Sequence, residues 1–361
     1  TKETQYRSYD TIIMSNDDES KKSPSSCIVT VIGLGSMGNG MAHALLDSSS
    51  CSTVTGYDMN QQLCQNFYDA SVKVEKAAAP KMPTELKESI DKEKTNFVVL
   101  CLLNEQQCEQ VCFGSGGGGD NLCSLLSSNG SCCVICTSTV TATWARSAKS
   151  RFEKANIKFV DCPVSGGPVR AKEGTLTLMV SGDDESLKMA NPLLDAMGRE
   201  IHIIQGGAGM GSTAKMVHQL LAGVHVCAAA ESLSLAASAG LDVQQMYDIV
   251  NGAAGASWMF KDRGQRMLTL PEQVKSALDI FVKDLNIVHT EAKALTSPIP
   301  LASAALQQFI SGQALGIGKQ DDSQVIQVYE KITGKSASSS SQKKNKKEEA
   351  NDDEDGPASK K

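Results

Sequence analysis

A lysine near the start of a long predicted helix is the side chain of this 361-residue chain best placed for acid–base chemistry. Gly209-Met210-Gly211-Ser212 leads into an alanine- and leucine-rich stretch that runs to about Ala239, so Ser212 is the predicted N-cap and Lys215 lies in the first helical turn. The positive end of the helix dipole and partial burial would both lower the pKa of this ammonium group toward the range useful for proton transfer. His218 and Gln219 follow three and four residues later and share its helical face.

A glycine-rich loop is the second feature with a chemical meaning. Gly33-Leu34-Gly35-Ser36-Met37-Gly38 follows a predicted strand, Cys27 to Ile32, and opens a predicted helix. Glycines at this spacing permit a tight turn and a close approach of the backbone to a pyrophosphate at the helix N-terminus. Asp58 lies 20 residues beyond Gly38, where a carboxylate can bind a ribose hydroxyl and repels a 2′-phosphate. The loop predicts a dinucleotide site that favours NAD over NADP.

Polar residues also follow other predicted strands, at the sheet edge where open α/β sheets bind ligands. Thr139 follows a strand that ends at Cys136, and Leu103-Asn104 ends another. Each is either a cofactor contact or a helix cap. Ser165-Gly166-Gly167 closes a further strand, and its hydroxyl and exposed N–H groups could bind a carboxylate, although a simple turn would have the same composition.

The elements that must position these residues alternate along the first half of the chain. Short apolar runs separated by helix-length segments predict a Rossmann-type, doubly wound parallel α/β sheet over residues 27–208. Residues 209–333 change to a helical pattern, which predicts an all-helical C-terminal domain joined to the sheet by a long interdomain helix of roughly 40 Å. The polar head, residues 1–26, and the charged tail, residues 334–361, are predicted to be disordered.

Composition excludes several classes of function. A net charge of -6 provides no basic field for nucleic acid, and the sequence lacks an uninterrupted apolar run long enough for a membrane span. The twelve cysteines lie mostly in apolar stretches such as Cys133 to Cys136, which reads as a buried strand, and no cluster has metal-ligand spacing, so we expect no metal. The acidic head has no import or secretion pattern, which favours the cytoplasm; because the chain starts with Thr, organellar import stays open.

At this point the motifs resemble a known family, the β-hydroxyacid dehydrogenases, which include 3-hydroxyisobutyrate dehydrogenase. The resemblance covers about residues 28 to 330 and rests on four ordered motifs: the glycine loop, Asp161 to Gly167 with Gly174-Thr175-Leu176, Gly209 to Lys215, and Lys283-Asp284-Leu285. It implies that Lys215 is catalytic, that Ser165, Gly166 and Gly167 bind the substrate carboxylate, and that Leu103, Asn104, Thr139 and Lys283 contact the cofactor. Most members carry Asn where this chain has Gln219, and that departure, with the run from Lys215 to His225, is similar to the branch that acts on L-threonate.

The resemblance implies NAD-dependent oxidation of a small hydroxy acid, with L-threonate and its 2-oxo acid as the expected pair. His218 and Gln219 would bind further hydroxyls of the substrate. Oxidation of 3-hydroxyisobutyrate and reduction of tartronate semialdehyde are the alternatives within the family, and a non-catalytic NAD-binding scaffold is the alternative of another class. The long apolar helix, with Ala228-Ala229-Ala230 and Ala236-Ala237, also suggests a homodimer or homotetramer.

Overall fold

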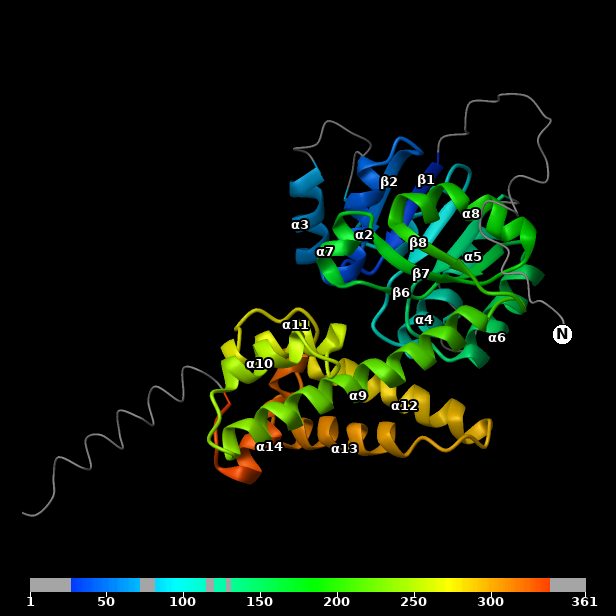
Figure 1. Cartoon of the computed structure of the whole chain (residues 1–361). Helices are drawn as coiled ribbons and strands as arrows, with labels where there is room; N and C mark the ends of the chain where they lie inside the picture. The colour runs from blue at the N-terminus through cyan, green and yellow to red at the C-terminus, as the bar shows by residue number, and fades with distance from the viewer. Residues whose placement is uncertain (1–26, 72–81, 115–119, 128–130, 338–361) are drawn as a thin grey trace, which may run out of the picture. The chain divides into compact units, whose positions relative to one another are not determined.

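The computed structural model describes residues 27–71, 82–114, 120–127 and 131–337, so the predicted head and all but the first residues of the predicted tail lie outside it. The chain divides into two compact units, residues 1–216 and 217–361, which are described in turn (Figure 1). The division falls inside one helix, α9 (Met210–Ser238), which begins in the first unit.

The first unit is built on a five-stranded parallel sheet in the order β2-β1-β3-β4-β5. The strands are β1 (Cys27–Ile32), β2 (Cys51–Tyr57), β3 (Phe97–Leu100), β4 (Cys133–Cys136) and β5 (Lys158–Asp161). The order reverses between β1 and β3, because the chain builds β2 on one side of β1 and then crosses to the other. In an open α/β sheet, this reversal opens a crevice for a ligand at the carboxyl ends of the two strands.

Helices cover both faces of this sheet, as the alternating sequence pattern predicts (Figure 1). They are α2 (Ser36–Asp47), α3 (Gln61–Ser71), the short 3₁₀ turn η2 (Leu86–Ser89), α4 (Glu105–Phe113), α5 (Leu122–Leu126), α6 (Ala142–Lys154), α7 (Gly167–Lys172) and α8 (Asp184–Met197). Successive residues of a strand point to opposite faces, so Val99 packs in the core with α2 and α8, whereas Val98 packs in the core with α4 and α6. Cys133 and Cys136 lie in β4 and are fully buried, which confirms the core-strand interpretation of that segment.

The last two strands predicted for this unit form a sheet of their own. β7 (Leu176–Val180) pairs with β8 (Gly198–Ile203) in parallel and with the two-residue β6 (Val164–Ser165) in the antiparallel direction. Leu176, Leu178 and Val180 pack into the same core as α2 and α8. Strand β6 begins three residues after Asp161, the last residue of β5, and runs antiparallel to β7. It contains Ser165, the first residue of the predicted carboxylate loop.

The second unit is helical, as predicted, and its described residues contain no strand. After α9 come α10 (Val243–Asn251), α11 (Trp258–Thr269), α12 (Leu278–Ala294), α13 (Pro300–Ala314), the 3₁₀ turn η3 (Asp322–Val325) and α14 (Ile326–Thr333). The rings of Phe281 and Phe309 stack with their centroids 4.9 Å apart, which joins α12 to α13. Gly223 lets α9 approach α12, since a Cβ there would lie 3.0 Å from the Leu285 side chain.

Among the helices that the structure describes, one, α9, is long and apolar enough to cross a membrane when judged by length and mean hydropathy alone. Half of that apolar window is buried inside the structure, as in the core helix of a folded domain. The apolar character of α9 is therefore accounted for by packing within the chain.

Candidate active site

A groove of about 600 Å³ lies in the first unit at the point where the strand order reverses. The residues that line it come from the glycine loop, from the end of β2 and from the segment after β3: Ile32, Gly33, Gly35, Ser36, Met37, Gly38, Tyr57, Asp58, Met59, Cys101, Leu102, Leu103, Asn104, Gln106, Gln107, Gln110 and Val111. Its place and its volume suit a nucleotide ligand.

The glycines of the loop serve two different purposes. Gly33 has φ +95°, and a Cβ at Gly38 would lie 1.8 Å from the Gly33 carbonyl oxygen, so the fold itself requires these two. Gly35 differs, because a Cβ there would meet nothing within 4 Å and its φ is -59°. No contact among the described residues therefore requires a glycine at position 35, whereas a pyrophosphate lying on the loop would.

The helix that follows the loop is open at its N-terminus. Helices α4, α5, α6 and α8 each begin with a side chain that accepts a backbone N–H, but the N-cap of α2 is Gly35 and makes no such bond. Uncapped N–H groups at a helix N-terminus attract an anion. Together with the empty space above Gly35, they fit the pyrophosphate of a dinucleotide.

Asp58 does more than the sequence predicted for it. Its carboxylate accepts the N–H of Leu34 at 2.8 Å and the N–H of Asn60 at 2.8 Å, one on each oxygen. These bonds fasten the glycine loop to the end of β2. Each carboxylate oxygen has a second lone pair, so both can still accept a ribose hydroxyl from the groove.

The segments after β3 and β4 contain the residues for which two interpretations were open. Asn104 caps α4 by accepting the N–H of Gln107 at 2.8 Å, which confirms the helix-cap interpretation, and it also lines the groove. Its contact with the cofactor stays a prediction. Leu103 is half exposed and also lines the groove. Thr139 does not line the groove, and the residue that caps α6 is Thr141. The cofactor contact of Thr139 stays a prediction.

The predicted lysine and the predicted carboxylate loop lie together in the first unit. Lys215 is 6% exposed, and its Nζ donates to the carbonyl oxygen of Val164 at 2.8 Å, directly beside Ser165. Gly166 and Gly167 have φ values of +141° and +79°, which L side chains rarely adopt. Apart from the two chain neighbours of Gly167, no described residue lies within 4 Å of its Cβ position, so a small ligand could lie against this turn.

A buried carboxylate that sequence reasoning passed over holds the start of α9. Asp161 accepts the N–H groups of Gly209 at 2.9 Å and Ser212 at 2.8 Å, the Ser212 hydroxyl at 2.7 Å and the Ser181 hydroxyl at 3.1 Å. Burial raises the pKa of Asp161, and these hydrogen bonds only partly offset the effect. A lone Asp at the end of an apolar strand was the available signal in the sequence.

This arrangement corrects the predicted start of the helix. Helix α9 begins at Met210, Ser212 is its third residue, and the capping oxygens come from Asp161 instead of from Ser212. Lys215 is therefore the sixth residue and lies beyond the first turn. The electrostatic effect of the helix N-terminus on the Lys215 ammonium group is therefore smaller than the sequence indicated. The Asp161 carboxylate, which already faces that terminus, reduces it further.

The other predicted site residues lie in the helical unit. Gln219 of α9 donates through Nε2 to Asp284 of α12, and its Oε1 lies 2.9 Å from Nδ1 of His218. Lys283 forms an ion pair with Asp284, with Nζ 2.7 Å from Oδ1. Asp284 belongs to this group, and the sequence assigned it no role.

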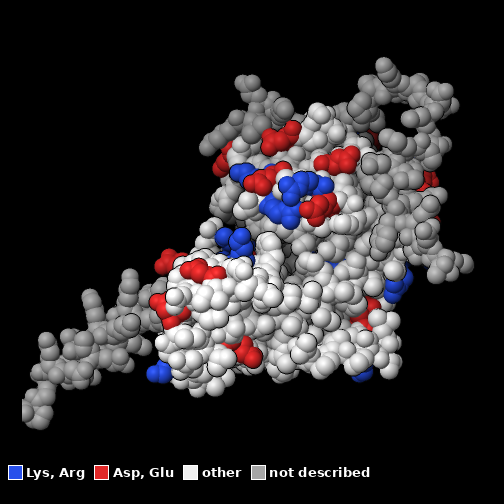
Figure 2. Space-filling view, in the orientation of Figure 1, with Lys and Arg blue, Asp and Glu red and all other residues white. Residues whose placement is uncertain are grey.

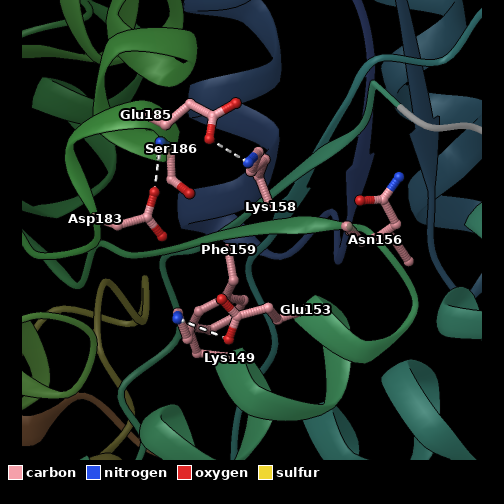
Figure 3. Close-up of a pocket in the computed structure, with 9 residues that line it drawn as sticks. Lys149, Glu153, Asn156, Lys158, Phe159, Asp183, Glu185 and Ser186 are labelled. Atoms are coloured by element: carbon pink, nitrogen blue, oxygen red, sulfur yellow. Dashed lines mark hydrogen bonds and ion pairs between the residues drawn. The ribbon is translucent and has the colours of Figure 1, made fainter.

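A second pocket, of about 340 Å³, lies between α6, β5 and α8 (Figure 3). Its lysines are already paired, Lys149 with Glu153 at 2.8 Å and Lys158 with Glu185 at 2.6 Å. Asp183 accepts the N–H of Ser186 as the cap of α8. The charged side chains of this pocket are paired within the protein, so we do not assign it a ligand.

In the part of the chain that the structure describes, no group of three His, Cys, Asp or Glu side chains could hold a metal ion.

The chain matches known proteins along almost all of its described length. Residues 28–207 match the NAD binding domain of 6-phosphogluconate dehydrogenase, and residues 209–329 match the NAD-binding domain of NADP-dependent 3-hydroxyisobutyrate dehydrogenase. The L-threonate dehydrogenase of Pectobacterium atrosepticum is 38% identical over 86% of this chain and 97% of its own length. The chain belongs to the β-hydroxyacid dehydrogenase family.

Other β-hydroxyacid dehydrogenases agree with this assignment. The L-threonate dehydrogenase of Escherichia coli is 37% identical over 86% of this chain and 98% of its own length. The crystal structure of a 3-hydroxyisobutyrate dehydrogenase from Salmonella typhimurium is 39% identical, covers 84% of this chain and 100% of its own, and superimposes with a TM-score of 0.74. The protein is a dehydrogenase of hydroxy acids with a nicotinamide dinucleotide, NAD or NADP, as its cofactor. The scaffold alternative is thereby set aside.

Proposed function

We propose that this β-hydroxyacid dehydrogenase oxidises L-threonate to its 2-oxo acid, with NAD as the preferred cofactor and Lys215 as the general acid and base. The observation that carries the proposal is the buried contact of Lys215 with Val164, next to the Ser165 loop, in a chain that is 38% identical to an L-threonate dehydrogenase. This contact supports the proposal because it holds the lysine beside the turn that we expect to bind the substrate carboxylate.

Each group has a defined task in this reaction. A nicotinamide held in the groove would supply the hydride chemistry at C2 of the substrate. Ser165 and the N–H groups of Gly166 and Gly167 hold the substrate carboxylate. Lys215 accepts the hydroxyl proton at Nζ as the hydride leaves and returns it in the reverse direction. Burial of Lys215 keeps bulk water away from that proton.

The remaining predicted contacts complete the two ligand sites. His218 and Gln219 bind hydroxyls of the substrate beyond the one that is oxidised. Thr139 and Lys283 contact the cofactor, in addition to the groove residues. Lys283 would do so as the residue that closes over it.

The preference for NAD rests on Asp58. A carboxylate at the end of β2 accepts ribose hydroxyls and repels a 2′-phosphate, and the following Met59-Asn60-Gln61 contains no arginine to bind such a phosphate. Because Asp58 also accepts the backbone N–H groups of Leu34 and Asn60, it is held at the edge of the groove.

A second substrate is favoured by one observation. The solved relative with 39% identity is named 3-hydroxyisobutyrate dehydrogenase, so that acid is the competing candidate. A 2-hydroxy-3-oxopropionate reductase of Escherichia coli, at 29% identity over 66% of this chain, supports tartronate semialdehyde less strongly.

The test is a substrate panel with the purified full-length chain. L-Threonate, D-erythronate, 3-hydroxyisobutyrate and D-glycerate are each mixed with NAD and, separately, with NADP, and formation of the reduced cofactor is followed by absorbance. We expect kcat/KM for L-threonate with NAD to exceed every other combination. A higher kcat/KM for 3-hydroxyisobutyrate would assign the chain to the competing substrate.

A further inference from the structure

Four side chains of the helical unit are linked in a row by one ion pair and two hydrogen bonds. Asp284, which is 2% exposed, accepts the amide N–H of Gln219 on one oxygen and lies 2.7 Å from the ammonium of Lys283 on the other. Gln219 is 8% exposed, and its Oε1 lies 2.9 Å from Nδ1 of His218. The order is therefore Lys283, Asp284, Gln219, His218, carried by α12 and α9.

The chemistry of the carboxylate determines the orientation of every group after it. An ionised carboxylate only accepts hydrogen bonds, so the side of the Gln219 amide that faces Asp284 must be its NH₂ group. The opposite orientation would place two oxygen acceptors against each other in a buried site, and the lost hydrogen bond would make that costly. The Gln219 oxygen must then face His218.

That oxygen in turn decides which nitrogen of the neutral imidazole carries the proton. A ring nitrogen 2.9 Å from an amide oxygen is stabilised as a donor, so Nδ1 is protonated and Nε2 is the acceptor. Asp284 thus selects the tautomer of a histidine that it does not contact, through the amide of Gln219.

We propose that Asp284 is a positioning residue for substrate specificity: through Gln219 it keeps His218 in the Nδ1-protonated form, so that Nε2 accepts a hydrogen bond from a substrate hydroxyl beyond the one that is oxidised. This inference rests on the proposed function, in which His218 binds such a hydroxyl. The preferred substrate is then a polyhydroxylated acid, and an acid without a further hydroxyl gains nothing from the arrangement.

The first experiment reads the tautomer directly and does not depend on activity. The full-length chain is labelled with ¹⁵N-histidine, and the ring nitrogens are observed by NMR at a pH where the imidazole is neutral. Loss of one set of signals in His218→Gln assigns His218 among the five histidines. We expect a protonated Nδ1 and an unprotonated Nε2; the reverse pattern would overturn the proposal.

The key variant is Asp284→Asn, which keeps the shape and removes the charge. Lys283 will retain the amide oxygen of the new residue, so its NH₂ group will face Gln219 and turn that amide around. The Gln219 NH₂ will then face His218, and we expect the proton to move from Nδ1 to Nε2. An unchanged tautomer in this variant would contradict the relay. If the variant does not fold, the wild-type signals alone decide.

Kinetics distinguish a specific role from a general loss of structure. At saturating NAD, so that any change at Lys283 does not enter, we expect Asp284→Asn to lower kcat/KM for L-threonate about tenfold, mainly through KM. The value for 3-hydroxyisobutyrate should stay within about twofold, because a misdirected hydrogen bond is worth on the order of one factor of ten. The matched control is Asp279→Asn on the same helix, whose carboxylate pairs with Lys319 at 2.8 Å and takes no part in the relay. The control should change neither value.

The outcomes separate the inference from the proposed function. Equal losses on both substrates would assign Asp284 a structural role only and overturn the inference, while the function stands. No turnover of L-threonate by the wild-type chain would contradict the proposed function, and the NMR experiment would still test the relay by itself.

Discussion

At the scale of single residues, Lys215 combines burial with a hydrogen bond from Nζ to the Val164 carbonyl oxygen. A carbonyl cannot neutralise the ammonium charge as a carboxylate would. The hydrogen bond fixes the position of Nζ, as the proposed proton transfer requires.

Replacing Lys215 by Met, which preserves the packing, should therefore lower kcat by roughly 10²- to 10⁴-fold, the usual contribution of a general acid or base. Affinity for NAD, measured by fluorescence titration, should change little. Lys149→Met is the control, because that lysine pairs with Glu153 on α6 and lies outside the site. Unchanged turnover in the Lys215 variant would refute its catalytic role.

The two glycines Gly35 and Gly38 allow a matched pair of substitutions. Gly38→Ala places a methyl group 1.8 Å from a backbone oxygen, so we expect a loss of about 1–3 kcal/mol in the free energy of unfolding. Gly35→Ala meets no protein atom within 4 Å and should leave thermal unfolding unchanged while weakening NAD binding at least about tenfold. If Gly35→Ala bound NAD as the wild type does, the pyrophosphate would not lie on this loop.

At the scale of elements, the start of α9 depends on a carboxylate from a distant part of the chain. Asp161 at the end of β5 satisfies two backbone N–H groups and two hydroxyls around the Gly209–Ser212 entry. Gly211 is needed for this approach, since a Cβ there would lie 2.4 Å from the carbonyl oxygen of Met179. The turn that carries Lys215 is held against β5 and β7 in this way.

We expect Asp161→Ala to lower the free energy of unfolding by about 2–4 kcal/mol, because several buried donors lose their partner at once. Asp183→Ala removes an exposed helix cap from α8 and serves as the control, with an expected cost of about 1 kcal/mol. Urea denaturation of both variants measures the difference. Equal costs would mean that Asp161 is no more than an ordinary cap.

Comparison of predicted and observed elements indicates where sequence patterns are reliable. Strands β1 to β5 and the helical second half were predicted because apolar periodicity is local and strong. The start of α9 was misplaced by three residues because the sequence has a serine at position 212, whereas the capping oxygens come from a residue 48 to 51 positions earlier in the chain. Capping by a distant side chain leaves no pattern near the helix.

At the scale of the whole molecule, a network of buried ion pairs connects α11 to η3. Arg266 pairs with Asp321 through Nη1 and with Asp262 through Nη2 at 2.8 Å. Arg263 donates to the two carboxylate oxygens of Asp322, from Nε at 3.0 Å and from Nη2 at 2.9 Å. Burial alone would raise the pKa of Asp321, but hydrogen bonds from Ser323 and Lys275 and the charge of Arg266 outweigh it and lower the pKa.

A lowered pKa in the folded state means that Asp321 stabilises the protein above its unfolded pKa and that this stability is lost as the pH falls. Compared with the wild type, Asp321→Asn should therefore be less stable by a constant amount above about pH 5, and the difference should shrink below about pH 4. Urea unfolding at several pH values measures it. A difference that does not depend on pH would show that Asp321 acts without its charge.

Self-association remains a prediction at this scale. Ala229, Ala230 and Ala236 are buried within the chain, so part of the alanine pattern on α9 is explained by internal packing. Leu235, Leu301 and Ile332 of the helical unit are 69%, 70% and 76% exposed, and the face of this unit drawn in Figure 2 carries few charged side chains. We expect a dimer or tetramer in analytical ultracentrifugation, and a purely monomeric chain would contradict this.

By itself, the sequence determined the fold class, the dinucleotide loop with Asp58 and the helical second half. It also indicated Lys215 and the Ser165 loop as candidate site residues. Each of these depends on local periodicity or on a motif with fixed spacing. Only the tertiary structure decided that Asp161 caps α9 and that Asp284 orients Gln219 toward His218. The physical reason is the same in both cases. A buried carboxylate acts on whichever donors the fold brings to it, and the distance along the chain between the partners, here 48 to 65 residues, carries no information about that contact.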